Sequence, residues 1–274
     1  MSTSIWWIRR DMRLADNKAL QSAAIAGDVV PLFVVDPRFE KAGSARRAFM
    51  FDTLRSLDTA TGGKLVLRFG DPAVEVPQMA REVGARSVHI SSDFAPYGQA
   101  RDQRVREALK QVDATLVESD SPYCVNPGTV LKDDGTPLKV FTPFYRRWSL
   151  VDFTSAVKTP VSYADAVSHC QGYPDIDSSS LELPDAGEEA AWRRWEEWSP
   201  RLEGYHDDRN NPGVDGTSLM SPYLRFGVVH PRQLIARLDG TSGADHYRRE
   251  LAWREFYADV LFHQPRTMWE NLQE

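Results

Sequence analysis

The sequence predicts an α/β fold with a parallel, doubly wound sheet, followed by a linker and the start of an all-helical part. Five short apolar runs alternate with four helical stretches as far as residue 118, which is the pattern of consecutive βαβ units. Residues 152–188 carry Pro, Ser, Asp and Gly without clear periodicity, which suits a linker. We therefore expect an α/β domain over 1–130, a linker over 131–188 and a partial helical domain over 189–274.

The strands are expected where Val, Ile, Leu and aromatic residues concentrate in short runs. They are Ser4–Arg9, Val29–Asp36, Lys64–Phe69, Ser87–Ser91 and Thr115–Glu118. The helices between them are Asn17–Ala26, Ser44–Thr61, Ala73–Val83 and Gln99–Gln111. A parallel sheet of this kind binds ligands at the carboxyl ends of its strands. No Gly-x-Gly-x-x-Gly follows the first strand, so the fingerprint of a nicotinamide-type dinucleotide is absent.

The second half of the chain begins with a surface excursion, rich in Pro, Gly and Asp, and ends in helices. A short helix is expected over Pro143–Trp148, and longer ones over Pro231–Leu238 and Ala244–Phe262. The tryptophans at 192, 195 and 198 are spaced for one helix side, which indicates a packed stripe. Fewer than about ninety residues is small for a helical domain with a deep cofactor site, so we expect the opening of a larger unit.

The composition is that of an ordinary globular protein. Of the 274 residues, 42% are hydrophobic and 26% are charged, and no apolar run is long enough to span a bilayer. Cys124 and Cys170 are too few for a disulfide framework, which suits a reducing cytoplasm, and no close Cys/His spacing indicates a zinc site. The formal net charge of -6 does not indicate nucleic-acid binding, but such binding depends on a local basic patch rather than on the total.

The segment Asp215–Ser221 (DGTSLMS) is the first candidate for chemistry. Hydroxyl groups and free backbone N–H groups at a turn or a helix start can bind a phosphate. The same residues also suit a simple turn followed by a helix cap. The pattern alone leaves both interpretations open.

The stretch Tyr247–Tyr257 (YRRELAWREFY) is the second candidate. On a helix, Glu250, Trp253, Arg254 and Tyr257 follow the spacing i, i+3, i+4, i+7 and share one face. A carboxylate, an indole, a guanidinium and a phenol together suit a pocket for a flat, polar aromatic ligand. The alternative is an amphipathic core stripe with a surface pair between Glu250 and Arg254.

Arginines are clustered in the same region and could form a surface that faces DNA, because guanidinium groups contact phosphates bidentately. They are Arg209, Arg225, Arg232, Arg237, Arg248, Arg249 and Arg254. A solvated charged face is the alternative, and several glutamates lie upstream in the sequence.

Four motifs, in order along the chain, resemble the DNA photolyase/cryptochrome family. WWIRRDMRLADNKAL near the N-terminus looks like the opening of that family, and Phe94–Asp102 (FAPYGQARD) matches a second stretch of the same domain. Asp215–Gly227 (DGTSLMSPYLRFG) looks like its flavin-phosphate segment, and Glu250–Pro265 (ELAWREFYADVLFHQP) like its helix facing flavin and DNA. Motifs that extend from Ile5 to Pro265 in the family's order are highly specific.

The resemblance implies a Rossmann-like α/β domain, a long linker and a helical domain that holds FAD in a folded, U-shaped conformation. The residues implied to contact FAD are Tyr205, Thr217, Ser218, Leu219, Met220, Ser221, Tyr247 and Arg254. The residues implied to contact DNA or the lesion are Arg209, Glu250, Trp253, Arg254 and Tyr257. In the family reaction, light-excited reduced FAD donates an electron to a cyclobutane pyrimidine dimer, while the protein supplies position and electrostatics. No catalytic side chain and no metal ligand is implied within the chain.

Some features depart from the family's pattern. Leu219 replaces an arginine common at that phosphate position, and His230 stands where a serine often precedes Pro-Arg. FAPYGQARD lacks the Asn-Glu pair of folate-binding members, so a second antenna chromophore, of folate or deazaflavin type, is left unassigned. The family's remaining flavin ligands and its tryptophan relay lie beyond a position like Glu274. We therefore expect a C-terminally truncated member that binds FAD weakly or not at all.

Three functions follow as alternatives. The first is a photolyase-like lyase acting on DNA that contains pyrimidine dimers, as a monomer when complete; Glu250 together with Trp253 favours it. The second is a cryptochrome-like blue-light sensor without repair activity. The third is a non-catalytic α/β module that binds a pigment or a partner chain through an exposed helical stub, because a fold alone does not establish an activity.

Overall fold

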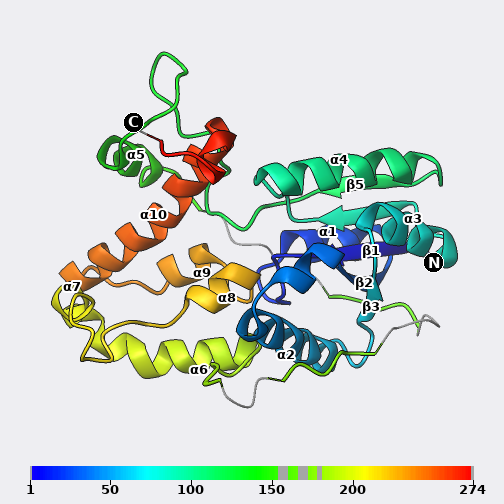
Figure 1. Ribbon diagram of the computed structural model, residues 1–274, viewed down its shortest axis with the longest axis horizontal. Helices are drawn as coiled ribbons and strands as arrows, with labels where there is room; N and C mark the ends of the chain where they lie inside the picture. The colour runs from blue at the N-terminus through cyan, green and yellow to red at the C-terminus, as the bar shows by residue number, and fades with distance from the viewer. Residues whose placement is uncertain (1, 154–159, 166–171, 178–180, 273–274) are drawn as a thin grey trace.

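The computed structural model describes residues 2–153, 160–165, 172–177 and 181–272. Five parallel strands form one sheet in the order β3-β2-β1-β4-β5 (Figure 1). They are β1 (Thr3–Ile8), β2 (Asp28–Val35), β3 (Val66–Phe69), β4 (Ser87–Ile90) and β5 (Thr115–Glu118). The first strand is central and later strands are added on both sides of it, which confirms the predicted doubly wound sheet.

Helices cover both faces of this sheet. The segments between the strands form α1 (Lys18–Ala26), 3-10 helix η1 (Pro37–Lys41), α2 (Ser44–Ala60), α3 (Pro72–Val83) and α4 (Pro96–Lys110). In β1, Trp6 and Ile8 pack with α1 and α2, whereas Ile5 and Trp7 pack with α3 and α4. Strands that are buried on both sides consist of nearly continuous apolar residues, which is why this half could be predicted.

Local sequence sets where these helices begin and end. Asn17 accepts a hydrogen bond from the N–H of Leu20 and caps α1, as an asparagine at this position commonly does. Gly84 ends α3 with a φ of 65°, a left-handed conformation that glycine adopts without strain. α4 begins at Pro96, earlier than the predicted start at Gln99, because proline in the first turn sacrifices no helical hydrogen bond.

His89 of β4 is buried against α1, and we expect it to make the stability of the fold depend on pH. Its ring nitrogens lie 2.8 and 2.9 Å from the hydroxyls of Ser22 and Ser87, and burial lowers its pKa to about 4. An unfolded histidine titrates near pH 6.5, so acidification protonates the unfolded chain first and favours unfolding. Between pH 7 and pH 5 we expect this residue to lower the free energy of unfolding by about 2 kcal/mol.

Urea denaturation of the wild type and of His89→Gln at pH 7 and pH 5 measures this contribution. The glutamine side chain cannot take up a proton in this range, so the variant should lose less stability on acidification than the wild type does. An equal loss in both proteins would show that His89 does not cause the pH dependence.

The predicted linker, residues 131–188, contains ordered structure that contacts both halves of the chain. α5 (Phe141–Trp148) forms where a short helix is predicted, and its Phe144 packs on Phe256 of α10 (Ser242–His263). Tyr163 forms an isolated parallel bridge with Val29 of β2. Cys170 lies outside the described residues. The boundaries at 130 and 188 stay predictions.

The chain after this segment is helical, as predicted, and α6 lies beside α2 in Figure 1. The elements are α6 (Glu188–Trp198), η2 (Ser199–Gly204), α7 (Tyr205–Asp208), α8 (Ser221–Phe226), α9 (Pro231–Ile235), α10 and η3 (Pro265–Met268). Trp195 and Trp198 of the predicted stripe are buried. Trp192 is partly exposed, and the guanidinium of Arg237 lies 3.9 Å from its ring centroid. The stripe is therefore mainly core, as its spacing indicates.

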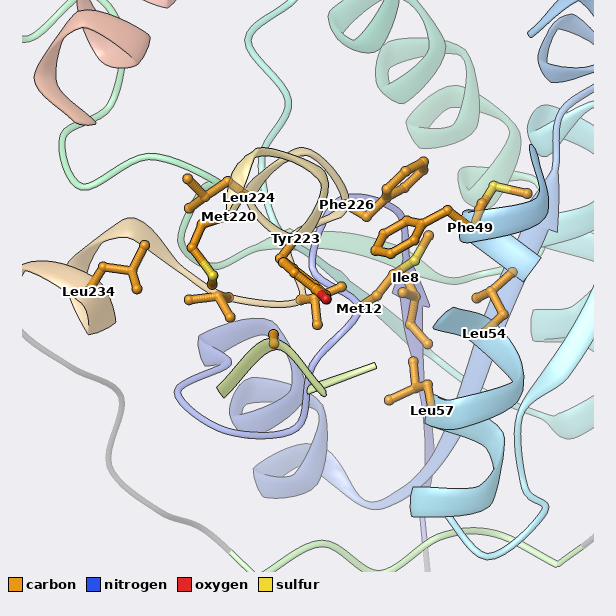
Figure 2. Close-up of a cluster of buried hydrophobic side chains, with 14 of the residues drawn as sticks. Ile8, Met12, Phe49, Leu54, Leu57, Met220, Tyr223, Leu224, Phe226 and Leu234 are labelled. Carbon is orange, nitrogen blue, oxygen red and sulfur yellow. The ribbon is translucent and has the colours of Figure 1, made fainter. Parts of the chain in front are cut away.

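One hydrophobic core connects the helical part to the sheet (Figure 2). The Phe49 ring of α2 lies 5.5 Å from the Tyr223 ring and 5.7 Å from the Phe226 ring, both on α8. Gly227 follows α8 with a φ of 67°, and a Cβ atom there would lie 1.8 Å from the Arg10 carbonyl oxygen. Only glycine allows this close approach, so α8 is fixed against the loop that follows β1.

Candidate functional site

The predicted phosphate segment, residues 215–221, leads into α8 with alternating burial. Thr217, Leu219 and Ser221 are exposed, whereas Ser218 and Met220 are buried. Leu219 is 52% exposed and has a φ of 55°, a conformation that few residues other than glycine adopt. The segment thus leaves the side chains of Thr217 and Ser221 accessible to a ligand.

Ser218 connects this segment to α10. Its Oγ atom lies 2.9 Å from the Tyr247 hydroxyl and accepts a hydrogen bond from the Met220 N–H at 3.3 Å. The Tyr247 ring is buried, with its centroid 5.3 Å from those of Tyr205 and Trp198, and burial raises its pKa. The structure therefore brings three residues that are predicted to contact FAD, Tyr205, Ser218 and Tyr247, into one cluster.

Replacing Tyr247 by phenylalanine is expected to lower the free energy of unfolding by about 1 kcal/mol, because a buried hydrogen bond with Ser218 is lost. Urea denaturation of Tyr247→Phe, Ser218→Ala and the double variant measures the coupling. The two single losses should add up to more than the loss in the double variant, since both remove the same interaction. Strictly additive losses would contradict a direct bond between the two hydroxyls.

Arg209 and Glu250, both predicted to contact DNA or the lesion, form an ion pair with each other. It joins the end of α7 to α10, and the Arg209 guanidinium also lies 5.7 Å from the Tyr205 ring centroid. The hydrogen bond to Glu250 is the main cause of a raised pKa for Arg209. The side chains are 31% and 37% exposed, so the pair contributes little to stability and both groups stay within reach of a ligand.

Trp253 has aromatic neighbours on α5 and on its own helix. The Phe141 ring is nearly parallel to the indole, with an interplanar angle of 7° and centroids 3.7 Å apart. Tyr257 lies 5.5 Å away, at 27°, and is 65% exposed. Because Phe141 covers one face of the indole, a base could stack on Trp253 only from the remaining side or after Phe141 moved.

Arg254 points into the contact between α10 and the α/β domain. Its guanidinium donates to the carbonyl oxygens of Pro122 at 2.9 Å and Leu224 at 3.3 Å, and lies 4.8 Å from the Tyr123 ring centroid. Burial is the main cause that lowers its pKa. The alternative surface pair with Glu250 is not formed among the described residues, because the buried guanidinium finds carbonyl acceptors instead. The side chains that were predicted to share one face of α10 therefore contact three different elements, α7, α5 and α8.

A cavity of about 360 Å³ lies at the carboxyl ends of β1 and β2, where parallel sheets bind ligands. Phe33, Met50 and Phe226 contribute apolar walls. Its charged lining residues are Arg9, Arg10, Arg38, Arg101, Arg225, Asp36 and Asp93. Arginines outnumber aspartates here although the whole chain has a formal charge of -6, so the cavity favours a ligand with an anionic group.

Several polar side chains of this cavity are fixed by ion pairs and hydrogen bonds. One Asp102 oxygen lies 2.6 Å from Arg9 Nη1 and 2.8 Å from Arg101 Nη2. The Tyr97 hydroxyl donates to the Asp36 carboxylate, and burial, followed by this hydrogen bond, raises the pKa of Tyr97 to about 12. The hydrogen bond to Asp36 thus fixes the Tyr97 ring as an aromatic part of the wall.

None of the residues predicted to contact FAD or the lesion lines this cavity, and Arg225, predicted for a DNA-facing surface, lines it instead. Two signals in the sequence point to the cavity. Arg9 and Arg10 directly follow the first strand, and Asp36 follows the second, which are positions where a parallel sheet places ligand contacts. Phe94–Asp102 is recognisable only as a family motif, yet it supplies Ala95, Tyr97 and Arg101. No signal in the sequence indicates that Arg225 would join them from α8.

The described residues, 2–153, 160–165, 172–177 and 181–272, contain a free thiol but no metal-binding group and no membrane-spanning helix. No three His, Cys, Asp or Glu side chains in these ranges are grouped so that they could hold a metal ion. Cys124 is a free thiol whose pKa is raised, first by burial and then by the charge of Glu255. No helix in the described part of the chain has both the length and the apolar character needed to cross a membrane.

Comparison with known proteins gives a consistent result. The family model described as DNA photolyase matches residues 4–161. A deoxyribodipyrimidine photo-lyase from Streptomyces griseus is 35% identical, over 99% of this chain and 63% of that protein. An uncharacterised 31.6 kDa protein from a Synechococcus species is 30% identical, over 92% of this chain and 98% of that protein. A class III photolyase structure from Agrobacterium tumefaciens has a TM-score of 0.85 and 26% identity, over 99% of this chain and 61% of that one.

The chain thus spans about 63% of the length of the Streptomyces photolyase, while it matches nearly the whole of one short relative. The family model covers more than half of the chain, and the match includes all of the parallel sheet except the first residue of β1. The similarity to the Streptomyces protein also extends through the helical part, where Ser218 and Tyr247 meet. Sheet, motif order and sequence identity together show that the chain belongs to the DNA photolyase family.

Proposed function

We propose that this chain supplies the α/β domain and one wall of the FAD site of a deoxyribodipyrimidine photolyase that splits cyclobutane pyrimidine dimers in DNA. The contact of 2.9 Å between Ser218 and Tyr247 carries the proposal, because it joins the phosphate segment to the helix that bears Glu250 and Trp253. Relatives named as photolyases support the lyase activity. The low cysteine content suits the cytoplasm as the place of action. When bound, reduced and excited by light, FAD would supply the electron that opens the dimer.

The residues on this wall fit the phosphates of FAD. Thr217 and Ser221 have exposed side chains that could donate hydroxyl hydrogen bonds, and Leu219 between them is exposed as well. Tyr205 and Tyr247 are buried and packed on each other, so they form the packed base on which the phosphate segment lies. Few charged groups are free for the cofactor here, and we expect low affinity for FAD.

The lesion would lie over Glu250, Trp253 and Tyr257 of α10. Glu250 could accept a hydrogen bond from a thymine edge, in exchange for or together with its pairing to Arg209. The exposed Tyr257 ring and the open part of the Trp253 indole offer aromatic contact for a flipped base. Extrusion of a dimer costs less than that of a normal base pair, because a dimer stacks and pairs poorly.

The cavity at the ends of β1 and β2 is our proposed site for a second, antenna pigment of folate or deazaflavin type. Phe33 and Phe226 would contact a planar ring system, and Arg10 with Arg225 would bind an anionic substituent. Fluorescence titration with each pigment tests this assignment. Binding that is weakened by Arg225→Ala supports it, whereas binding that the substitution leaves unchanged would place the pigment elsewhere.

Light-dependent repair by the purified chain tests the main proposal. The chain, reduced FAD and an oligonucleotide with a thymine dimer are illuminated, and we expect dimers to disappear faster than in the dark or without protein. Glu250→Ala should slow the loss, while Glu203→Ala, an exposed glutamate in η2, should not. Flavin binding without dimer loss would favour a light sensor, and no detectable flavin binding would overturn the cofactor assignment.

A further inference from the structure

One arginine of α6 holds the phosphate segment in its turn conformation. The Arg194 guanidinium donates to the carbonyl oxygens of Ser218 at 3.1 Å and Thr217 at 3.0 Å, and to the Asp215 carboxylate at 3.1 Å. Arg201 of η2 donates to the other carboxylate oxygen of Asp215 at 2.9 Å. The Arg194 side chain is 22% exposed. A single, mostly buried guanidinium therefore contacts three oxygen atoms within four consecutive residues.

This arrangement fixes the direction of two backbone N–H groups. In a trans peptide the C=O and the following N–H point to opposite sides, and the described chain has no cis peptide bond. Because the carbonyls of Thr217 and Ser218 point to Arg194, the N–H groups of Ser218 and Leu219 point away from it. Within the described residues neither N–H has a hydrogen-bond acceptor.

The backbone around these N–H groups has the alternation that is typical of anion-binding turns. Leu219 has a positive φ of 55°, and Met220 follows with right-handed values of -76° and -6° for φ and ψ. Alternating hand at two residues directs the N–H groups from the first of them onward into one concavity, so it bears on the Leu219 N–H, while the Met220 N–H donates to Ser218 Oγ at 3.3 Å. Since leucine at 219 has no charge to offer, a phosphate contact here depends on the backbone.

We propose that Arg194 is the positioning residue of this segment, which orients the N–H groups of Ser218 and Leu219 toward the phosphates of the flavin. The inference rests on the proposed function, because it takes FAD as the ligand. Arg194 acts by orienting the backbone more than by attracting the phosphates, because Asp215 opposes its positive charge. The hydrogen bond from Arg194 is the main cause of the lowered pKa of Asp215. The neighbouring Arg193 pairs with Asp185 on the surface and, within the described residues, forms no hydrogen bond or ion pair with segment 215–221, which makes it a matched control.

Titration with inorganic pyrophosphate, followed by amide NMR spectra, tests the positioning role. In the wild type we expect the signals of Ser218 and Leu219 to shift. Arg194→Ala should weaken pyrophosphate binding roughly fivefold, as expected for the loss of about one well-oriented hydrogen bond. The affinity of Arg194→Lys for pyrophosphate should lie between those of the wild type and Arg194→Ala, because an ammonium group cannot match the planar fork of a guanidinium. Arg193→Ala should bind pyrophosphate like the wild type. The heteronuclear NOE of residues 216–220 should drop in Arg194→Ala and stay at the wild-type value in Arg193→Ala.

The possible outcomes separate this inference from the proposed function. If the wild type binds pyrophosphate and Arg194→Ala binds it equally well, the positioning role is overturned while the phosphate site stands. If pyrophosphate shifts neither amide in the wild type, the phosphate site is overturned and the positioning role with it. Should Arg194→Ala fail to fold, Arg194→Lys decides: weakened binding at an unchanged melting temperature supports the role, and unchanged binding contradicts it.

Discussion

Replacing Arg232 by methionine is expected to lower the free energy of unfolding by about 3–5 kcal/mol. Arg232 of α9 is 4% exposed, with Nε 2.6 Å from an Asp16 oxygen and Nη2 2.5 Å from an Asp120 oxygen. These two carboxylates raise the pKa of the arginine against the effect of burial. Methionine retains much of the side-chain volume but no charge, so two largely buried carboxylates lose their partner. Urea denaturation measures the loss.

Arg237→Met provides the control for this substitution. Arg237 lies just beyond the same short helix but is exposed, and its guanidinium stacks on Trp192. Its replacement should cost about 1 kcal/mol or less. Adding Asp120→Asn to Arg232→Met should recover part of the loss, because one stranded charge is removed. Equal losses in the Arg232 and Arg237 variants would show that the buried ion pairs do not stabilise the fold.

The burial of Arg232 also shows where charge patterns in a sequence mislead. Arg232 and Arg254 belong to the cluster of arginines predicted to face DNA, yet both lie inside the contact between the helical part and the α/β domain. Their partners are far away in the sequence: Asp120 is separated from Arg232 by 112 positions, and Pro122 from Arg254 by 132. Spacing along a helix predicts its exposed face only when such long-range partners are known.

The α/β half could be predicted because its signals are local. Strands buried on both faces, such as β2, leave continuous apolar runs, and the helices between them begin at caps such as Asn17. The candidate site is formed differently. Trp253 is covered by Phe141, a residue of the predicted linker, and segment 215–221 is held by Arg194 of another helix. Neither contact leaves a periodic pattern in the sequence. The motifs could therefore be predicted, but the residues that contact them could not.

Glu255 of α10 is a further residue whose contacts could not be predicted from the sequence. Its replacement by alanine is the second large effect that we expect. Glu255 is 2% exposed and accepts hydrogen bonds from the N–H groups of Cys124 and Val125 at 2.5 and 3.1 Å, and from the Trp148 indole at 2.5 Å. It thus connects α10 to α5 and to the chain that follows β5. Glu255→Ala leaves one buried and two part-buried donors without an acceptor and should cost about 3–5 kcal/mol. Glu255→Gln keeps one accepting oxygen and should cost less.

The reactivity of Cys124 distinguishes a local effect of Glu255 from general destabilisation. Burial, and secondly the charge of Glu255, raise the pKa of this thiol, so the wild type should react slowly with a thiol reagent at neutral pH. In a Cys170→Ser background, Glu255→Ala should speed labelling of Cys124 by about tenfold or more, because residues 124 and 125 are no longer held to α10. Arg232→Met, at matched loss of stability, should speed it less, since the carboxylate contacts to Cys124 and Val125 remain. Equal rates in the two variants would mean that Glu255 stabilises the whole molecule without fixing this segment in particular.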